Sequence, residues 1–91
     1  MIVQKFKIGE PYNIVLNGGV EIIARINNIS GGDLTINCCK KLVDGICSHY
    51  PPFSKLNSTI TLKEHAVMMI CEVDPDVKSV YEQYIENYDN C

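Results

Sequence analysis

Hydrophobic and polar residues alternate in three consecutive segments in the first half of the chain, and this alternation predicts β-strands. The expected strands run over Tyr12–Leu16, Val20–Ile29 and Asp33–Val43. Glycine-rich turns separate them, at Asn17–Gly19 and at Gly31–Gly32, where glycine supplies the positive φ that a tight hairpin needs. The first half therefore predicts three antiparallel strands joined by short turns.

Two of these strands have a clear apolar face. In the second strand that face is made by every other residue, namely Val20, Ile22, Ala24 and Ile26. In the third strand the same period of two places Leu34, Ile36 and Cys38 together. Both faces are expected to point into one core.

The rest of the chain is less regular. Ile2–Ile8 is expected to form an extended arm or a short strand, and Asp44–Ser58, with its Asp-Gly and Pro-Pro pairs, is expected to be a long loop. Thr59–Leu62 and Ala66–Val73 are expected to form a second hairpin around Lys63–His65. Three strands, a long connection and two further strands predict a small, strongly bent five-stranded barrel.

A helix is expected at the end of the chain, over about residues 75–88. Asp74 suits the N-cap and Pro75 the first helical position. The apolar residues beyond them recur at helical spacing on one face, namely Val77, Val80, Tyr81, Tyr84, Ile85 and Tyr88. This stripe packs either on the chain's own barrel or on a neighbouring chain, and we expect its own barrel.

The length of 91 residues fits a single domain spanning residues 1–91, with the barrel over about residues 12–73. The formal net charge is −3, but it is uneven: six acidic residues and Lys78 give the segment from Glu72 to Cys91 a charge of −5, which leaves +2 on the rest. No secretory signal or membrane span is visible. The number of cysteines, five, is odd, so reduced cysteines and a cytoplasmic location are expected.

Two motifs in the barrel resemble the signature of the Sm-like RNA-binding ring proteins. The first motif of that family is matched in spacing by Leu16, Gly19, Ala24, Arg25 and Ile26, followed by Leu34 and Ile36. The second is matched in length and apolar pattern by Leu62–Ile70. The resemblance covers about residues 12–73.

The chain departs from the family pattern at several positions. Ala24 stands where the family has glycine, Asp33 where it has asparagine, and Lys63-Glu64 where it has Arg-Gly. The expected helix is C-terminal, whereas family members usually carry an N-terminal one. These departures are typical of a divergent branch, such as the Sm-like proteins carried by phages, which would place the protein in the host cytoplasm.

The resemblance implies a mainly β fold, an Sm-like (SH3-like) barrel with a C-terminal α-helix. It also implies a homo-oligomeric ring of about five to seven subunits, closed by pairing the fourth strand of one subunit with the fifth strand of the next. The residues expected at that interface are Val67, Met68, Met69 and Ile70.

The resemblance further implies that single-stranded RNA, or DNA, binds at turns near the pore of the ring. The candidate contacts are Ser30, Gly31, Gly32, Asp33, Lys63, His65 and Arg25. Lys63 would meet a phosphate, and His65 would stack on a base. Asp33 and Glu64 oppose phosphate binding by their charge.

Two other functions stay open. The same ring could act as a scaffold that engages a protein through its acidic helical end or through Asp44–Ser58. Alternatively, Cys38, Cys39, Cys47 and His49 offer thiolate and imidazole groups that suit zinc, although their spacing is not a standard one. We favour burial of Cys38 and expect no metal or other cofactor, and no nucleophile–base or carboxylate pair predicts an enzyme.

Overall fold

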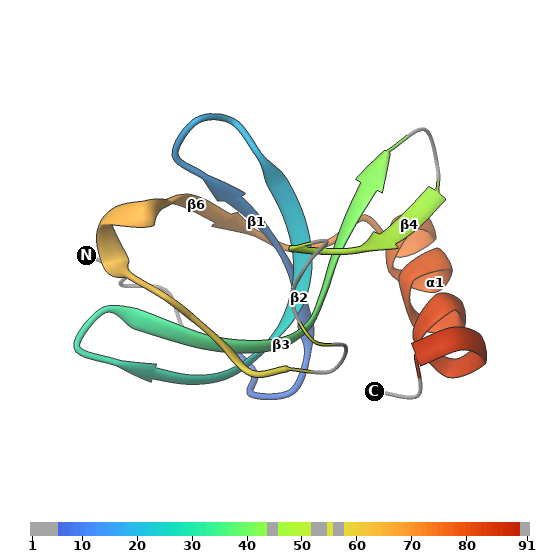
Figure 1. The fold of residues 1–91 in the computed structure, drawn as a ribbon, viewed down its shortest axis with the longest axis horizontal. Helices are drawn as coiled ribbons and strands as arrows, with labels where there is room; N and C mark the ends of the chain where they lie inside the picture. Colours follow the sequence, from blue (N-terminus) through green and yellow to red (C-terminus); the bar gives the residue numbers. More distant parts are fainter. Residues whose placement is uncertain (1–5, 44–45, 52–54, 56–57, 90–91) are drawn as a thin grey trace.

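The computed structural model describes residues 6–43, 46–51, 55 and 58–89 of the chain. Its described strands form one strongly curved sheet, and a single α-helix lies against one end of that sheet (Figure 1). The elements are β1 (Pro11–Leu16), β2 (Glu21–Ser30), β3 (Asp33–Val43), β4 (Ile46–His49), β5 (Ile60–Leu62), the 3₁₀ turn η1 (Glu64–Ala66), β6 (Val67–Cys71), α1 (Pro75–Tyr84) and the π-helical turn η2 (Ile85–Asp89).

All strand pairs are antiparallel, and the main path through the sheet is β4-β3-β2-β1-β6. The long strand β3 also pairs with β5, so two different strands share one of its edges. β4 pairs with the end of β3 at residues 40–43, and β5 pairs with its beginning at residues 34–36. Register shifts in the β1–β6 and β2–β3 pairs bend the strands, as bulges do, and curl the sheet into an open barrel.

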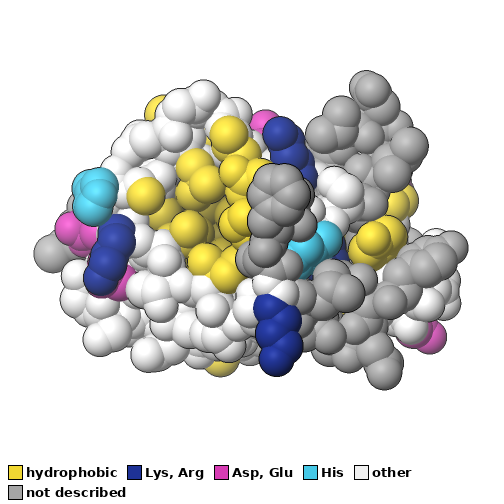
Figure 2. All heavy atoms as spheres, viewed as in Figure 1, with side chains coloured by type: hydrophobic (Ala, Val, Ile, Leu, Met, Phe, Trp, Pro, Cys, Tyr) yellow, Lys and Arg dark blue, Asp and Glu magenta, His cyan; other side chains and the backbone are white. Residues whose placement is uncertain are grey.

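The inner core follows the alternation in the sequence. The predicted apolar face of β2 is confirmed, because Ile22, Ala24 and Ile26 are all buried inside the curved sheet. Residues from β1, β3 and β6 complete the cluster, namely Ile14, Leu34, Ile36, Cys39 and Ile70. Figure 2 shows hydrophobic side chains gathered in the hollow of this face.

A second, smaller core lies between the sheet and the helix. It consists of Ile23 and Cys38 from the sheet with Tyr81 and Ile85 from the helical end. The predicted packing of the helix on its own barrel is therefore confirmed. Ile23 lies on the outer face of β2, which the alternation pattern predicts to be exposed to solvent. It is buried because the helix covers this face.

Cys38 differs from its predicted orientation. It was expected to share a face with Leu34 and Ile36, but its φ of 54° reverses the alternation within β3. Cys38 therefore points toward the helix, and Cys39 takes the next place in the inner core. The bulge falls where the β2–β3 register shifts, between Ile23 and Arg25.

The start of the helix agrees with the capping pattern. The Asp74 carboxylate accepts a hydrogen bond of 2.9 Å from the backbone N–H of Asp76, and Pro75 is the first helical residue. Tyr81 is fully buried and donates a hydrogen bond of 2.6 Å from its hydroxyl to the Cys38 carbonyl oxygen. None of the helices in the described part of the chain is long and apolar enough to cross a bilayer.

Two predictions about the second half are wrong. The expected loop Asp44–Ser58 contains β4, which pairs with the end of β3 so that Val43 lies opposite Ile46. The expected hairpin of Thr59–Leu62 with Ala66–Val73 is also absent from the described residues: these segments give β5 and β6, which pair with β3 and β1 instead. Most of the predicted arm Ile2–Ile8 lies outside the described residues.

Candidate functional site

Two turns far apart in the sequence meet at one end of the barrel. They are the β2–β3 turn, Ser30–Asp33, and the turn before and within η1, Lys63–His65. The backbone N–H of Glu64 donates a hydrogen bond of 2.9 Å to the Asp33 carboxylate, and the Lys63 ammonium lies 3.4 Å from the other oxygen of the same group. We call this group of residues the turn cluster.

Gly32 adopts the backbone conformation that the first of these turns needs. Its φ is +89°, which favours glycine. The Glu64 carboxylate occupies the space where a Cβ would stand and would have to rotate away from it. In Figure 2, basic, acidic and histidine side chains gather at the left edge, the edge where Figure 1 draws this part of the barrel.

The turn cluster contains two acidic residues, Asp33 and Glu64, and one basic residue, Lys63. The hydrogen bond from the Glu64 backbone lowers the pKa of the Asp33 carboxyl, desolvation opposes it, and the hydrogen bond and charge of Lys63 and the nearby His65 lower it further. Asp33 is therefore ionised at neutral pH and neutralises Lys63, while the Glu64 carboxylate adds a second negative charge. The turn cluster offers no excess of positive charge to a phosphate.

A third segment, the β1–β2 turn, also contacts the turn cluster. The side-chain amide of Asn17 donates a hydrogen bond to the carbonyl oxygen of His65, and its backbone N–H donates one of 2.8 Å to the carbonyl oxygen of Ala66. Sequence analysis missed this role of Asn17, which it assigned to the turn alone. The contact leaves the side chain of His65 exposed, together with Ser30 and Gly31.

Arg25 lies away from the turn cluster. It is half-buried on β2, opposite Pro11 on one side and Asn37 on the other. Five residues of strand separate it from Ser30, which corresponds to about 16 Å. The structure therefore brings together the other predicted contacts, Ser30–Asp33, Lys63 and His65, but not Arg25.

Three strands lie at open edges of the described sheet, namely β4, β5 and β6. In the described part of the chain β4 and β5 pair only with β3 and β6 pairs only with β1, so each of these strands keeps one edge without a partner. Met68 and Met69, on β6, are 53% and 48% exposed. Ile70, in contrast, is buried in the inner core and Val67 packs against it, so of the four residues predicted at the interface only the two methionines present their side chains outward.

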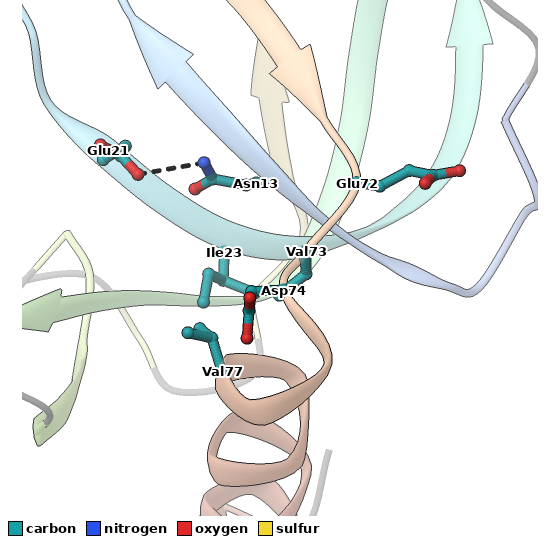
Figure 3. A pocket seen from close by; sticks show the side chains of 7 residues that line it. All are labelled: Asn13, Glu21, Ile23, Glu72, Val73, Asp74 and Val77. Atoms are coloured by element: carbon teal, nitrogen blue, oxygen red, sulfur yellow. Dashed lines mark hydrogen bonds between the residues drawn. The ribbon is translucent and has the colours of Figure 1, made fainter.

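A groove of about 260 Å³ lies where β6 leads into the helix. Its apolar wall consists of Ile23, Val73 and Val77, and acidic side chains stand around it (Figure 3). Glu21 accepts a hydrogen bond of 3.0 Å from the side chain of Asn13. The other acidic residues at the groove are Glu72 and Asp74. The sequence pattern does not predict this groove, because its residues come from β1, β2, α1 and the connection between β6 and α1.

The cysteines do not form a metal site in the described part of the chain. Cys38 and Cys39 point to opposite sides of β3, as expected for neighbours in a strand, and no group of three metal-ligating side chains occurs among the described residues. Cys38 is disulfide-bonded, which differs from the expected reduced state, whereas Cys39 and Cys71 are free thiols. Burial raises the pKa of Cys39 to about 12, so the thiol stays protonated at neutral pH. Because the thiolate is the nucleophilic form, Cys39 acts as a buried core residue.

No protein-family model matches this chain, and no curated protein matches it. Among solved structures it is similar to the crystal structure of a heptameric archaeal Sm protein, with a TM-score of 0.56 and 18% sequence identity. The match covers 74% of this chain and 90% of the archaeal chain. At this level of identity the similarity shows the fold: the chain has the Sm-like fold, a curved antiparallel sheet, here with one C-terminal helix.

Proposed function

We propose that this protein assembles into an Sm-like homo-oligomeric ring that binds single-stranded nucleic acid, in the first place RNA. The observation that carries the proposal is the combination of two open strand edges with two turns joined at one end of the barrel. Its role is binding, and no reaction is part of the proposal. The departures from the family motif at Ala24 and Lys63 are typical of a divergent branch, and the proposal includes a phage-type protein that acts in the host cytoplasm.

The ring would close by pairing β5 of one subunit with β6 of the next. An exposed strand edge presents unsatisfied N–H and C=O groups and favours pairing with another strand. The exposed methionines Met68 and Met69 add apolar surface at that edge, which burial between subunits would remove from water. The archaeal protein with the same fold is a heptamer, which supports closure into a ring.

The turn cluster would then be repeated once per subunit around the ring. Because Lys63 is paired with Asp33, this cluster suits bases better than phosphates. The exposed His65 is suited to stack on a base, and Ser30 offers a hydroxyl for a hydrogen bond to a base edge. Stacking on an aromatic side chain contributes about 1–3 kcal/mol per base, so a ring of such contacts would hold a strand without strong electrostatic attraction.

Binding of a fluorescent oligouridine, measured by anisotropy, tests this role. The wild-type protein is expected to bind the single strand and to ignore a duplex of the same length. His65→Ala is expected to weaken binding at least tenfold, whereas Glu82→Ala, at an exposed position on α1, should leave it unchanged. A wild-type protein that forms a ring but does not bind the oligonucleotide would contradict the nucleic-acid part of the proposal.

A second function, a protein-binding scaffold built on the same ring, is favoured by the charge distribution. The turn cluster has no positive excess, and the groove of Figure 3 combines an apolar wall with Glu21, Glu72 and Asp74. Such a surface repels phosphates and complements a basic segment of another protein. A ring that fails to bind nucleic acid in the anisotropy experiment would favour this function.

A further inference from the structure

Lysine side chains in the described part of the chain differ in what surrounds their charge. Lys63 lies 3.4 Å from the carboxylate of Asp33, and Lys78 lies 3.4 Å from that of Glu10. A phosphate that approached either lysine would compete with a carboxylate already in place. These two lysines are therefore poor points of contact for a nucleic-acid backbone.

The β3–β4 hairpin carries a different charge. Between Leu34 and Tyr50 the sequence has Lys40, Lys41 and a single acidic residue, Asp44, which gives this segment a formal charge of +1. The segment therefore has a small positive excess, although the whole chain has a net charge of −3. Such a local excess attracts phosphates whatever the sign of the total.

The two lysines of the hairpin lie on opposite faces. Lys40 is 1% exposed, and its ammonium lies 5.9 Å from the centre of the Tyr84 ring, on the face that the helical end covers. Lys41, one residue on, points to the other face, where Ser48 is its partner across the strand pair. Lys41 is half-exposed and Ser48 is exposed, so this face is open to a ligand.

Among the described residues, the ammonium of Lys41 contacts an aromatic ring and not a carboxylate. Its ammonium lies 5.8 Å from the centre of the Tyr50 ring, a cation–π contact, and the described residues give it no carboxylate partner. An aromatic ring restricts the motion of the lysine but carries no net charge, so the full positive charge stays available. The outer strand β4 lies at the edge of the sheet and places Ser48 beside Lys41, where its hydroxyl donates a long, exposed hydrogen bond of 3.3 Å to the Lys41 carbonyl oxygen. A phosphate oxygen at this face would accept that hydroxyl proton in place of the carbonyl.

We infer that the phosphate backbone of the bound strand is contacted by Lys41 and Ser48 on the open face of the β3–β4 hairpin, whereas the turn cluster contacts bases. This inference rests on the proposed binding of single-stranded nucleic acid. It divides the two tasks between two places on each subunit. The division explains how a protein whose turn cluster has no positive excess, and whose C-terminal end is acidic, would hold a polyanion.

The test compares Lys41→Gln with Lys78→Gln, which removes the same charge from a lysine that is already ion-paired. Affinity for the labelled oligouridine is measured over a range of salt concentrations. For each subunit that contacts the strand, the loss of one phosphate contact should reduce the slope of log K against log salt by about 0.7, which corresponds to about fivefold weaker binding per contact near 0.1 M salt. Lys78→Gln is expected to change neither quantity, and Lys41→Arg should keep wild-type affinity.

The outcomes separate this inference from the proposed function. If the wild-type protein binds and Lys41→Gln gives the same affinity and salt slope, the inference is overturned while nucleic-acid binding stands. If Lys41→Gln and Lys78→Gln weaken binding equally, net charge and not the hairpin is responsible, which also overturns it. If the wild-type protein does not bind at all, both the inference and the proposed function are overturned. Solution mass and circular dichroism establish that each variant is folded and assembled as the wild type.

Discussion

The contact that fixes the helix on the barrel gives the sharpest prediction about stability. Tyr81 is fully buried and its hydroxyl donates a hydrogen bond of 2.6 Å to the carbonyl oxygen of Cys38, which is 1% exposed. Tyr81→Phe removes the donor and keeps the ring, so the packing of the second core is preserved. The carbonyl of Cys38 then loses this donor at a position that water does not reach.

The expected loss follows from the burial of both groups. Leaving a buried acceptor without its donor costs about 1–3 kcal/mol, more than the net value of a typical hydrogen bond. For a domain of this length a loss of 1 kcal/mol lowers the melting temperature by about 4–8 °C. Tyr81→Phe is therefore expected to lower the free energy of unfolding by about 2 kcal/mol.

Urea denaturation followed by far-ultraviolet circular dichroism measures this loss, at one fixed protein concentration because assembly adds to apparent stability. Tyr12→Phe is the matched control: the Tyr12 hydroxyl accepts a hydrogen bond of 2.9 Å from the backbone N–H of Lys7, but at an exposed site where water can replace it. This variant should lose less than about 0.5 kcal/mol. Equal losses for the two variants would refute the reasoning, because burial would then have no effect.

Three further predictions concern the edge, the turn cluster and the thiols. Met68→Lys should disrupt the ring and lower the solution mass, since a charge on an open edge prevents strand pairing, whereas Val80→Lys on the exposed face of α1 should not. The pKa of Asp33 is lowered from 3.8 in the folded state, so its contribution to the free energy of unfolding is complete above pH 3.8 and is lost as the pH falls through the lowered pKa. In Asp33→Asn the free energy of unfolding should therefore fall less steeply with decreasing pH below 3.8, as denaturation curves at several pH values can check. At pH 8 iodoacetamide should label the exposed Cys71 and spare Cys39, as peptide mass spectrometry can check, and equal labelling would show that Cys39 is accessible.

Local pattern was sufficient for the first three strands and for the helix. The alternation of apolar and polar residues in β1 to β3 indicates which side of each strand is buried. The pair Asp74-Pro75 marks the helix start, because the Asp74 side chain accepts a hydrogen bond from a free backbone N–H and Pro75 needs no hydrogen-bond acceptor there. The apolar stripe of α1 gave the correct packing of Tyr81 and Ile85. Val80 belongs to the same predicted stripe but is 43% exposed and lies outside the second core.

Pairing between distant segments was harder to predict. The left-handed backbone at Cys38 reverses the side to which the later residues of β3 point. The alternation of apolar and polar residues does not show where such a bulge occurs. Likewise β5 and β6 are close in sequence but pair with β3 and β1, because the turn between them spans an open side of the barrel. The family resemblance predicts that the β2–β3 turn meets Lys63–His65. It does not predict the distance of Arg25 from these turns, which is set by the length of β2 between Arg25 and Ser30.

Solution mass tests the central claim, the ring, most directly. Light scattering after size exclusion, with and without a short labelled oligouridine, gives the mass of the assembly and shows whether RNA travels with it. The account predicts a mass of several subunits of 10.2 kDa each and comigration of the oligonucleotide. A monomer at micromolar concentration, with or without RNA, would contradict the pairing of β5 with β6 on which the ring depends.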